Sequence, residues 1–334
     1  MIVNPKVSIL VPIYGVEKFI ERCAISLFDQ TFQDIEYIFV NDCTPDNSID
    51  ILINTLERYS HRKAQVKIIN HDANKGLAGA RNTGVQNASG DYILHVDSDD
   101  YLELNAIELL YNKAFEENSD IVVCDFIMEW PETSMKVIQN IDVKDKFEFL
   151  NLLLSGQTMT CVWNKLIKRD LYVKNSVRTI EGVNLGEDFT VIPKLVFYAN
   201  SISKVNKYLY HYVQFNSQSY TKNINLKYIN NLETVISSLD SFFVNNNLDD
   251  HYRLSLLECK LRKKLELIIK VNKDLISYVL DLYPETKEIE GNVILPKRDK
   301  ITFFVMKKCS RKFIEYYSIC FKFLFSINQK MKKR

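Results

Sequence analysis

Short apolar runs alternate with segments of helical periodicity along the first part of the chain. The runs are rich in β-branched residues and predict strands at residues 7–13, 35–40, 66–69, 92–96 and 121–124. Between them, apolar residues recur three or four positions apart, which predicts helices at residues 19–27, 48–59, 77–88 and 104–117. This alternation is typical of an α/β fold with a mostly parallel sheet and flanking helices.

The later part of the chain has a different pattern. Residues 126–144 are weakly patterned and fit a hairpin, and the segments after them predict helices at 147–154 and 188–198 and a strand at 202–214. From about residue 226 to 282 the pattern is nearly all helical. We therefore expect two parts, residues 1–222 as the α/β domain and residues 223–334 as a mostly helical region that ends in a basic amphipathic tail at 297–334.

Composition narrows the class of protein. Of 334 residues, 46% are apolar and 25% are charged, which fits a globular protein with a substantial core. No apolar run approaches the ~18 residues of a membrane-spanning helix. Seven cysteines without a CxxC pair predict neither a disulfide framework nor a zinc ribbon, so we expect a reducing, cytoplasmic compartment. The N-terminal apolar stretch is interrupted by Pro12 and is not expected to be a signal peptide.

The net charge of +1 conceals an asymmetry. Residues 297–334 contain twelve Lys or Arg and two acidic residues, a charge of +10, so the rest of the chain carries −9. The acidic main part argues against nucleic-acid binding. The tail interleaves basic and aromatic residues, which suits a helix lying on an anionic membrane. A terminal helix that packs on the protein by its apolar face fits the same pattern.

An acidic cluster follows the predicted strand at 92–96. The strand continues directly into Asp97, Ser98, Asp99 and Asp100. Ligands of open α/β sheets bind beyond the carboxyl ends of the strands, and neighbouring carboxylates repel one another unless a cation lies among them. Mg²⁺ sites combine one or two carboxylates with substrate phosphates. We therefore expect Mg²⁺ or Mn²⁺ at Asp97 and Asp99; a solvated acidic turn or a helix cap is the alternative, above all for Asp100.

Other polar and aromatic residues follow the first three strands and are expected at the same edge. They are Pro12, Tyr14, Glu17, Asp42, Lys75 and Arg81. A carboxylate such as Asp42 can accept a hydrogen bond from a base, Tyr14 can stack on it, and cations can bind phosphates. Taken singly, each has an ordinary explanation as a turn or surface residue. The chain contains neither GxGxxG nor GxxxxGK[ST], so dinucleotide and Walker sites are not indicated.

A second group of candidates lies downstream. Glu187 and Asp188 stand at a predicted helix start, where they either cap the helix or provide a general base. Trp163, Asn164 and Lys165 offer a flat apolar face with polar edges for an acceptor sugar; a core position for Trp163 is the alternative. His211, in a tyrosine-rich strand, is interpreted as structural.

Taken together, these motifs resemble the family 2 glycosyltransferases of the GT-A fold. The matching segments, in the family's order over about residues 5–220, are VSILVPIYGVEKFI, FVNDCTPDNS, NKGLAGARNTGVQNASGDYILHVDSDD, VWNKLIKRDL and GEDF. The resemblance implies that uridine is held by Pro12, Tyr14, Glu17 and Asp42, with Lys75 and Arg81 near the ribose and phosphates. It further implies a DxD element at Asp97, Ser98 and Asp99, with Asp99 as the direct metal ligand. Asp188, beside Glu187, matches the general base.

The resemblance implies an inverting, metal-assisted transfer of a sugar. The donor would be a nucleotide-sugar, in particular a UDP-sugar, and the acceptor a hydroxyl of a saccharide or lipid-linked saccharide in cell-surface polysaccharide synthesis. The enzyme would be cytoplasmic or peripheral on the inner face of the cell membrane. Two departures stand out: Cys43 replaces the glycine that is common after the aspartates of strand two, and Val213 and Gln214 stand where an arginine is common.

Two other functions fit parts of the pattern. A phosphotransferase with Asp97 as nucleophile requires Thr or Val two residues after Asp99, where Tyr101 stands. A catalytically inactive binding or scaffold subunit of a polysaccharide assembly needs no intact carboxylates, yet the acidic residues are all present. Nucleotide-specific turnover separates both from the transferase.

Overall fold

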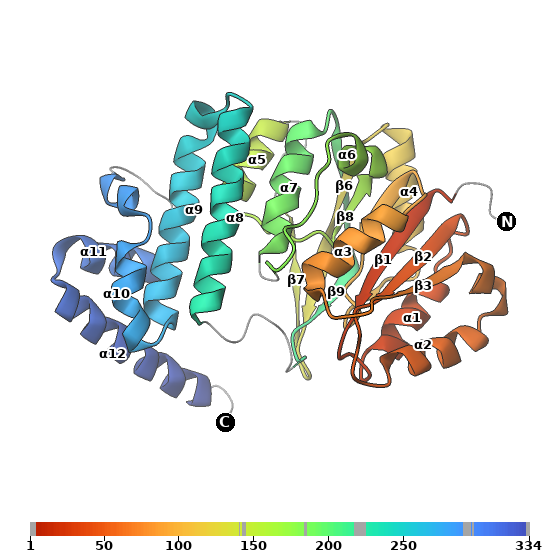
Figure 1. The fold of residues 1–334 in the computed structure, drawn as a ribbon, viewed down its shortest axis with the longest axis horizontal. Coiled ribbons are helices and arrows are strands. Elements are labelled where there is room, and N and C mark those ends of the chain that lie inside the picture. The colour runs from red at the N-terminus through yellow and green to blue at the C-terminus, as the bar shows by residue number, and fades with distance from the viewer. Residues whose placement is uncertain are drawn as a thin grey trace. The chain divides into compact units, whose positions relative to one another are not determined.

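The computed structural model describes residues 5–139, 141, 145–183, 186–216, 225–289, 295 and 297–331. The chain divides into two compact units (Figure 1). Unit 1 comprises Met1–Leu150 with Thr158–Tyr220, and unit 2 comprises Asn151–Gln157 with Thr221–Arg334. The sequence pattern places the division between residues 222 and 223.

Unit 1 is built on a mixed sheet. Its described strands are β1 (Val7–Ile13), β2 (Ile35–Asn41), β3 (Val66–Asn70), β4 (Tyr92–His95), β5 (Tyr101–Leu102), β6 (Ile121–Glu129), β7 (Ser134–Val137), β8 (Lys165–Lys168) and β9 (Ile202–Val213). They follow the order β3-β2-β1-β4-β8-β6-β9-β5, and β7 pairs with β6. The first four strands of this order are parallel, and β8 runs antiparallel to both of its neighbours.

The predicted α/β class is confirmed, with one correction to the sheet. The sheet is mixed rather than mostly parallel, because β8 enters between β4 and β6 in the opposite direction. The pattern gave no sign of this strand, since Lys165–Lys168 is short and begins with a charged residue. The hairpin expected within 126–144 is present as the antiparallel pair β6–β7; residues 140 and 142–144 lie outside the described part.

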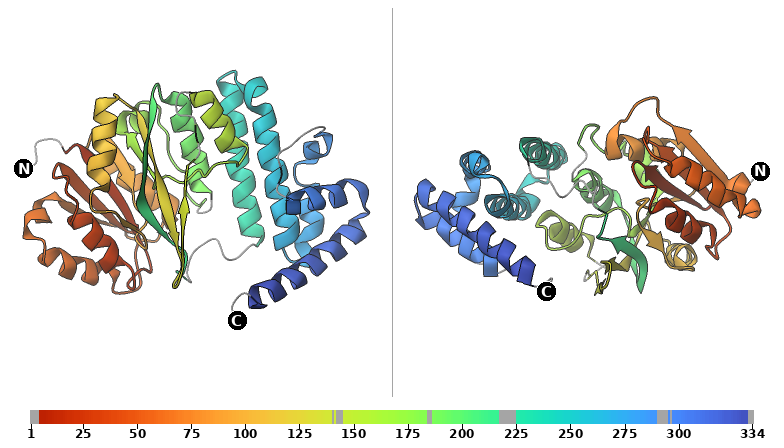
Figure 2. Two further views of the ribbon diagram at one scale, coloured as in Figure 1. Left: turned by 180° about the vertical axis from the view of Figure 1, so that it is seen from behind. Right: turned by 90° about the horizontal axis from the view of Figure 1, so that it is seen from below.

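Helices cover both faces of this sheet. The helices of unit 1 are α1 (Ile20–Phe28), α2 (Ser48–Glu57), α3 (Gly76–Asn87), α4 (Ala106–Glu116), α6 (Arg169–Lys174) and α7 (Glu187–Tyr198). Helix α5 (Lys146–Leu154) begins in unit 1 and ends in unit 2. In β1, Ile9 and Val11 belong to the core cluster that α1 and α4 share, whereas Leu10 points to the other face. There a Cβ on Gly84 would lie 3.3 Å from Leu10, so the glycine lets α3 approach β1 closely. Figures 1 and 2 show α3 on one side of the strands and α1, α2 and α4 on the other.

Unit 2 is helical and has a core of its own. Its described helices are α8 (Leu226–Asn245), α9 (Asp249–Lys270), α10 (Lys273–Asp281), α11 (Lys297–Lys308) and α12 (Arg311–Met331). Leu232 and Ile236 of α8 are buried in one cluster with Leu265 and Ile268 of α9, among others. The helical pattern predicted beyond residue 226 is therefore observed, and helix continues in the basic tail as far as Met331.

Candidate active site

Three parallel strands of unit 1 deliver polar residues to one edge of the sheet. The carboxyl ends of β1, β2 and β4 lie side by side, because these strands pair in parallel. Asp42 follows β2, and Asp97 comes two residues after β4. This is the edge at which α/β sheets bind their ligands. The acidic cluster thus stands where the sequence placed it.

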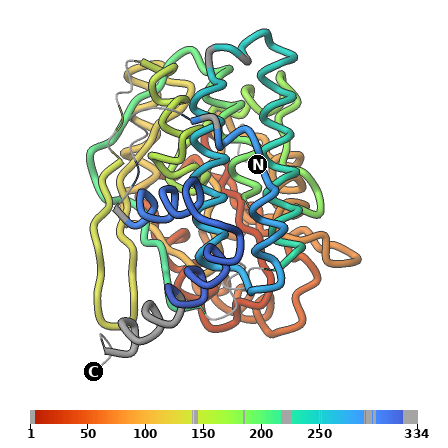
Figure 3. Tube along the Cα trace, turned by 90° about the vertical axis from the view of Figure 1, so that its left-hand side faces the viewer, coloured from red at the N-terminus to blue at the C-terminus, as the bar shows by residue number. Residues whose placement is uncertain are grey.

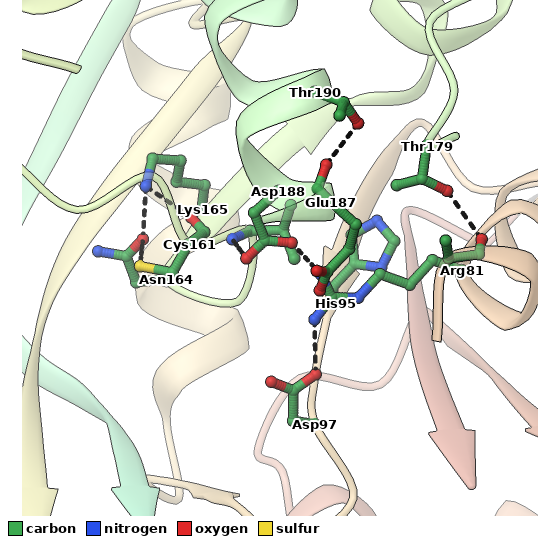
Figure 4. Close-up of polar contacts among 12 residues, drawn as sticks. Arg81, His95, Asp97, Cys161, Asn164, Lys165, Thr179, Glu187, Asp188 and Thr190 are labelled. Carbon is green, nitrogen blue, oxygen red and sulfur yellow. Dashed lines mark hydrogen bonds and ion pairs between the residues drawn. The ribbon is translucent and has the colours of Figure 1, made fainter. Parts of the chain in front are cut away.

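Arg81 of α3 gathers three of the predicted carboxylates around one guanidinium (Figure 4). Its Nη2 donates to Asp97 Oδ1 at 2.9 Å, and its Nη1 donates to Glu187 Oε1 at 2.9 Å and also to Asp188 Oδ1. The Arg81 side chain is only 3% exposed. The site therefore brings together residues more than a hundred positions apart in the chain, and Arg81 acts as the counter-ion of the acidic residues.

Glu187 and Asp188 stand in the first turn of helix α7 and contact a residue of another helix. Helix α7 begins after Gly186, whose φ of 72° lies in the left-handed region that favours glycine. The N-cap residue has no side chain to cap the helix, and the carboxylates of Glu187 and Asp188 both reach Arg81. Asp188 Oδ2 also accepts a hydrogen bond from the backbone N of Val162 at 3.1 Å. Both carboxylates thus have partners outside their own helix, and Asp188 is held in one orientation by two of them.

One guanidinium leaves this cluster with excess negative charge. Burial raises the pKa of Asp188, Arg81 opposes the rise, and Asp97 adds to it. Burial also raises the pKa of Glu187, and Asp188 beside it adds to the rise. Behind the cluster, burial and Arg81 lower the pKa of His95 to about 3, so this imidazole is neutral and supplies no further positive charge. Carboxylates in such surroundings readily accept a proton.

The acidic loop after β4 divides into two roles. Asp100 is fully buried and accepts hydrogen bonds from Tyr210 Oη and the Val213 backbone N, both at 2.7 Å. It anchors the loop to β9 and does not cap α4, so the helix-cap alternative does not hold for Asp100. Asp99 is partly exposed, and its Oδ2 accepts from Asn216 Nδ2 at 2.8 Å.

Asp97 and Asp99 offer carboxylate oxygens, the type of donor that hard divalent cations prefer. Burial raises the pKa of Asp99, and the neighbouring Asp97 raises it further, so the protein itself does not fully compensate the charge of Asp99. Within the described ranges, no three His, Cys, Asp or Glu residues form a complete metal cage. Two carboxylates without a cage fit Mg²⁺ or Mn²⁺, since such ions take the remaining ligands from water and substrate phosphates. Any metal at this edge would be held by Asp99 and Asp97.

Asp42 is directed inward, toward the start of α3. It is 2% exposed, and its carboxylate accepts from the backbone N of Lys75 at 2.7 Å and of Gly76 at 2.8 Å. His71 Nδ1 lies 2.7 Å from Asp42 Oδ1, and His71 Nε2 lies 2.8 Å from Thr83 Oγ1. Asp42 therefore positions the loop that carries Lys75. The sequence analysis missed His71, although its place directly after β3 puts it at the same edge.

The remaining candidates for the donor lie around the ends of β1, β3 and β4. Tyr14 is 45% exposed just beyond β1, and Lys75 is exposed at the start of α3. Glu17 accepts from the backbone N of Asn47 at 3.3 Å. Pro12 lies within β1 opposite Val40, and Ser98 is buried.

The three acceptor candidates are corrected by the structure. Trp163 is 3% exposed and stacks on Tyr210, with ring centroids 4.3 Å apart. Asn164 and Lys165 are fully buried, and Lys165 Nζ donates to Cys161 O and Asn164 Oδ1, both at 2.7 Å. These side chains belong to the core beneath the site, because an aromatic cluster and an internal hydrogen-bond network absorb them. His211 is likewise structural, with its ring nitrogens 2.8 Å from Glu103 and Glu129.

Cys43 has a backbone conformation that is energetically unfavourable for any residue except glycine. Its φ is 58°, in the left-handed region, which costs about 1–2 kcal/mol for an L-residue and nothing for glycine. Glycine also lowers stability by ~0.5–1 kcal/mol, because it gives the unfolded chain more conformational entropy. We expect Cys43→Gly to raise the free energy of unfolding by up to about 1 kcal/mol in urea titrations. Cys43→Ala is the control and should change little; a glycine variant less stable than the alanine variant contradicts this.

The inward hydrogen bonds of Asp42 make a second stability prediction. The substitution Asp42→Ala removes the carboxylate and leaves two backbone N–H groups and His71 without their hydrogen-bond partner. We therefore expect the free energy of unfolding to fall by about 2–3 kcal/mol. Asp72→Ala removes an exposed acid from the same loop and should stay within about 0.5 kcal/mol of the wild type. Equal stability of the two variants in urea unfolding would show that Asp42 does not hold the loop.

Comparison with known proteins gives consistent matches. The family model described as Glycosyl transferase family 2 matches residues 8–174. An uncharacterized glycosyltransferase of Bacillus subtilis, EpsJ, is 37% identical over 55% of this chain and 54% of its own length. The putative glycosyltransferase EpsH of the same organism is 31% identical over 76% of this chain and 73% of its own. The chain thus spans about half the length of the first relative.

Solved structures share the fold. TarS 1–349 of Staphylococcus aureus, crystallised with UDP-GlcNAc, superimposes with a TM-score of 0.70 over 95% of this chain and 88% of its own, at 18% identity. The same protein crystallised with UDP superimposes with a TM-score of 0.68. At this identity the likeness concerns the fold, and it supports the GT-A architecture with a helical C-terminal region.

Proposed function

The chain belongs to glycosyl transferase family 2 and is a glycosyltransferase, and from this premise we propose that it transfers a sugar from a UDP-sugar to an acceptor hydroxyl with inversion at the anomeric carbon. The observation that carries the proposal is the arrangement around Arg81. Asp97 contacts Nη2 of this guanidinium, and Asp188 contacts its Nη1. In the proposed function Asp97 helps to bind the donor diphosphate, and Asp188, a neighbour on the same guanidinium, accepts the proton.

The choice of a uridine nucleotide rests on two supports. The solved structures of TarS contain UDP and UDP-GlcNAc, and this chain shares their fold. At the same edge as Asp97, the chain presents the exposed Tyr14 ring and the exposed Lys75 side chain. An aromatic ring can stack on a base, and an ammonium group can bind a phosphate.

Each step of the proposed sugar transfer can be assigned to residues of this chain. Asp99 and Asp97 would hold Mg²⁺ or Mn²⁺, which supplies Lewis-acid stabilisation of the negative charge that develops on the leaving diphosphate. Asp188 takes the proton of the acceptor hydroxyl as this oxygen attacks the anomeric carbon from the face opposite the diphosphate. A single displacement inverts the configuration, and no covalent enzyme intermediate is required. Arg81 positions the Asp188 carboxylate by a hydrogen bond, and Glu187 accepts a hydrogen bond from the same guanidinium.

A donor screen tests the proposed function. The full chain is incubated with a panel of nucleotide-sugars and Mn²⁺, and nucleotide release and glycosylated products are followed by mass spectrometry. We expect release of UDP from one or a few UDP-sugars. Release of inorganic phosphate instead supports the phosphotransferase, and an absence of turnover with every donor supports a scaffold role.

The acceptor and the setting belong to the same proposal. We propose that the acceptor is a saccharide or a lipid-linked saccharide of cell-surface polysaccharide synthesis, and that the enzyme works at the inner face of the cell membrane. The proposal is supported by the strong positive charge of residues 297–334. A lipid-linked acceptor remains in the membrane, so an enzyme that uses it gains from a membrane-binding surface.

A further inference from the structure

The last two helices expose apolar side chains at helical spacing. On α11, Ile301 and Phe304 are exposed, and on α12, Phe313, Tyr316 and Ile319 are exposed. Successive members on each helix are three positions apart, so on each helix they lie along one side. Phe304 and Tyr316 are 63% and 66% exposed, which is unusual for side chains of this size.

The exposure of these side chains does not mean that the two helices are unpacked, because the opposite side of each helix is buried. On α11, Thr302 and Met306 are buried, and on α12, Ile314 is buried in the core of unit 2. Ser318 is fully buried, and its Oγ donates to Ile268 O of α9 at 2.5 Å. Figure 3 shows both helices at the end of unit 2, outside α9 and α10. Each helix is therefore held by one face and presents a second apolar face outward.

Exposed lysines accompany the apolar side chains. Lys300 and Lys308 stand four positions before and after Phe304, and Lys312 stands four positions before Tyr316. Residues four apart are neighbours on a helix surface, so Phe304 has two lysines beside it and Tyr316 has one. We call the five apolar residues and these three lysines the basic aromatic face. The segment that contains it carries +10, whereas the rest of the chain carries −9.

This combination favours a lipid surface over a protein partner. Lysine is depleted in protein–protein interfaces, whereas helices that lie on membranes pair large apolar side chains with Lys and Arg. Lysine can bury its stem among lipids and keep its charge at anionic headgroups. In the part of the chain that the structure describes, no helix is long and apolar enough to cross a bilayer. The face would thus lie on the membrane rather than span it.

We propose that the basic aromatic face binds the surface of an anionic phospholipid bilayer, with α11 and α12 lying along it. The inference rests on the proposed function in one respect, the use of a membrane-borne acceptor. It concerns a surface of unit 2 that the sugar-transfer chemistry does not use. The phenylalanine and tyrosine rings would enter the headgroup region, and the lysines would bind the lipid phosphates.

The test is sedimentation of the full chain with vesicles of phosphatidylcholine alone or mixed with phosphatidylglycerol. We expect binding to the mixed vesicles that weakens as salt rises. A variant with Lys300→Gln, Lys308→Gln and Lys312→Gln should bind about 100-fold more weakly, since each charge near an anionic surface contributes about fivefold. A variant with Phe304→Ser, Phe313→Ser and Tyr316→Ser should also lose binding, and Leu254→Ser, which changes an exposed residue of α9, should not.

The outcomes are distinct. Wild-type binding by both triple variants overturns the proposal, as does equal binding to neutral and anionic vesicles. If the face instead binds a second copy of the chain, light scattering shows a dimer for the wild type and a monomer for the serine variant. That result overturns the proposal too. UDP binding by each variant is measured in vesicle-free solution; because all substitutions are on exposed positions of unit 2, we expect it to be unchanged. If the wild type does not bind UDP, the proposed function is contradicted, and the result of the vesicle experiment still stands.

Discussion

Replacing Asp188 with Asn should lower kcat by about 10²–10⁴-fold, the usual contribution of a general base, while UDP binding is kept. The amide has nearly the same shape as the carboxylate and can still accept a hydrogen bond from the Val162 backbone N. It cannot take the proton of the acceptor hydroxyl. The loss should therefore appear in the chemical step, measured as transfer at saturating donor and acceptor, and not in calorimetric binding of UDP.

Glu187→Gln is the matched control for this variant. It changes the other carboxylate that contacts the same Arg81 guanidinium and leaves the carboxylate of Asp188 in place. The Glu187 side chain is 9% exposed against 17% for Asp188, so Asp188 is the more accessible of the two to an acceptor. We expect Glu187→Gln to keep more activity than Asp188→Asn by about tenfold or more. The assignment of the base fails if Asp188→Asn turns over at nearly the wild-type rate, or if Glu187→Gln is the slower variant.

Replacing Asp99 with Ala should abolish the part of UDP binding that depends on Mn²⁺. In the wild type we expect calorimetry to show UDP binding about 100-fold tighter with Mn²⁺ than without it, since a metal stabilises phosphate charge by several kcal/mol. Burial and the neighbouring Asp97 raise the pKa of Asp99, and Asp99 is partly exposed at the edge of the sheet. In the variant, the two titrations should coincide.

Asp72→Ala separates a specific site from a general effect of charge. Asp72 is an exposed acid at the same edge, in the loop after β3, and it is not part of the acidic cluster after β4. Its removal should leave the Mn²⁺ dependence of UDP binding as in the wild type. Equal effects of Asp72→Ala and Asp99→Ala would mean that the cation acts by screening alone, and the metal assignment would be withdrawn.

Local patterns along the chain predicted much of this fold. Strand β1 was predicted with its observed bounds, because seven residues covered on both faces form a continuous apolar run. Strand β8 was missed for the opposite reason. Its first residue, Lys165, is fully buried, and its charge is accommodated by Cys161 O and Asn164 Oδ1, which only the folded chain brings together.

The site shows the same limit. The position of Asp97 after a buried strand, and of Glu187 and Asp188 at a helix start, was predicted from local sequence. The pairing of Arg81 with all three was not, because it joins α3, the end of β4 and the start of α7. Trp163 could not be assigned to core or acceptor surface from sequence, since an aromatic ring suits both; its stacking on Tyr210 of β9 decides for the core.

The central claim is that a divalent cation held by Asp97 and Asp99 anchors the diphosphate of an activated sugar. A crystal of the full chain grown with UDP and Mn²⁺, with diffraction recorded at the manganese absorption edge, tests it most directly. The account predicts one anomalous peak in contact with an oxygen of Asp99 and with the UDP phosphates. A nucleotide bound away from the carboxyl end of β4, or bound there with no manganese beside it, would contradict it.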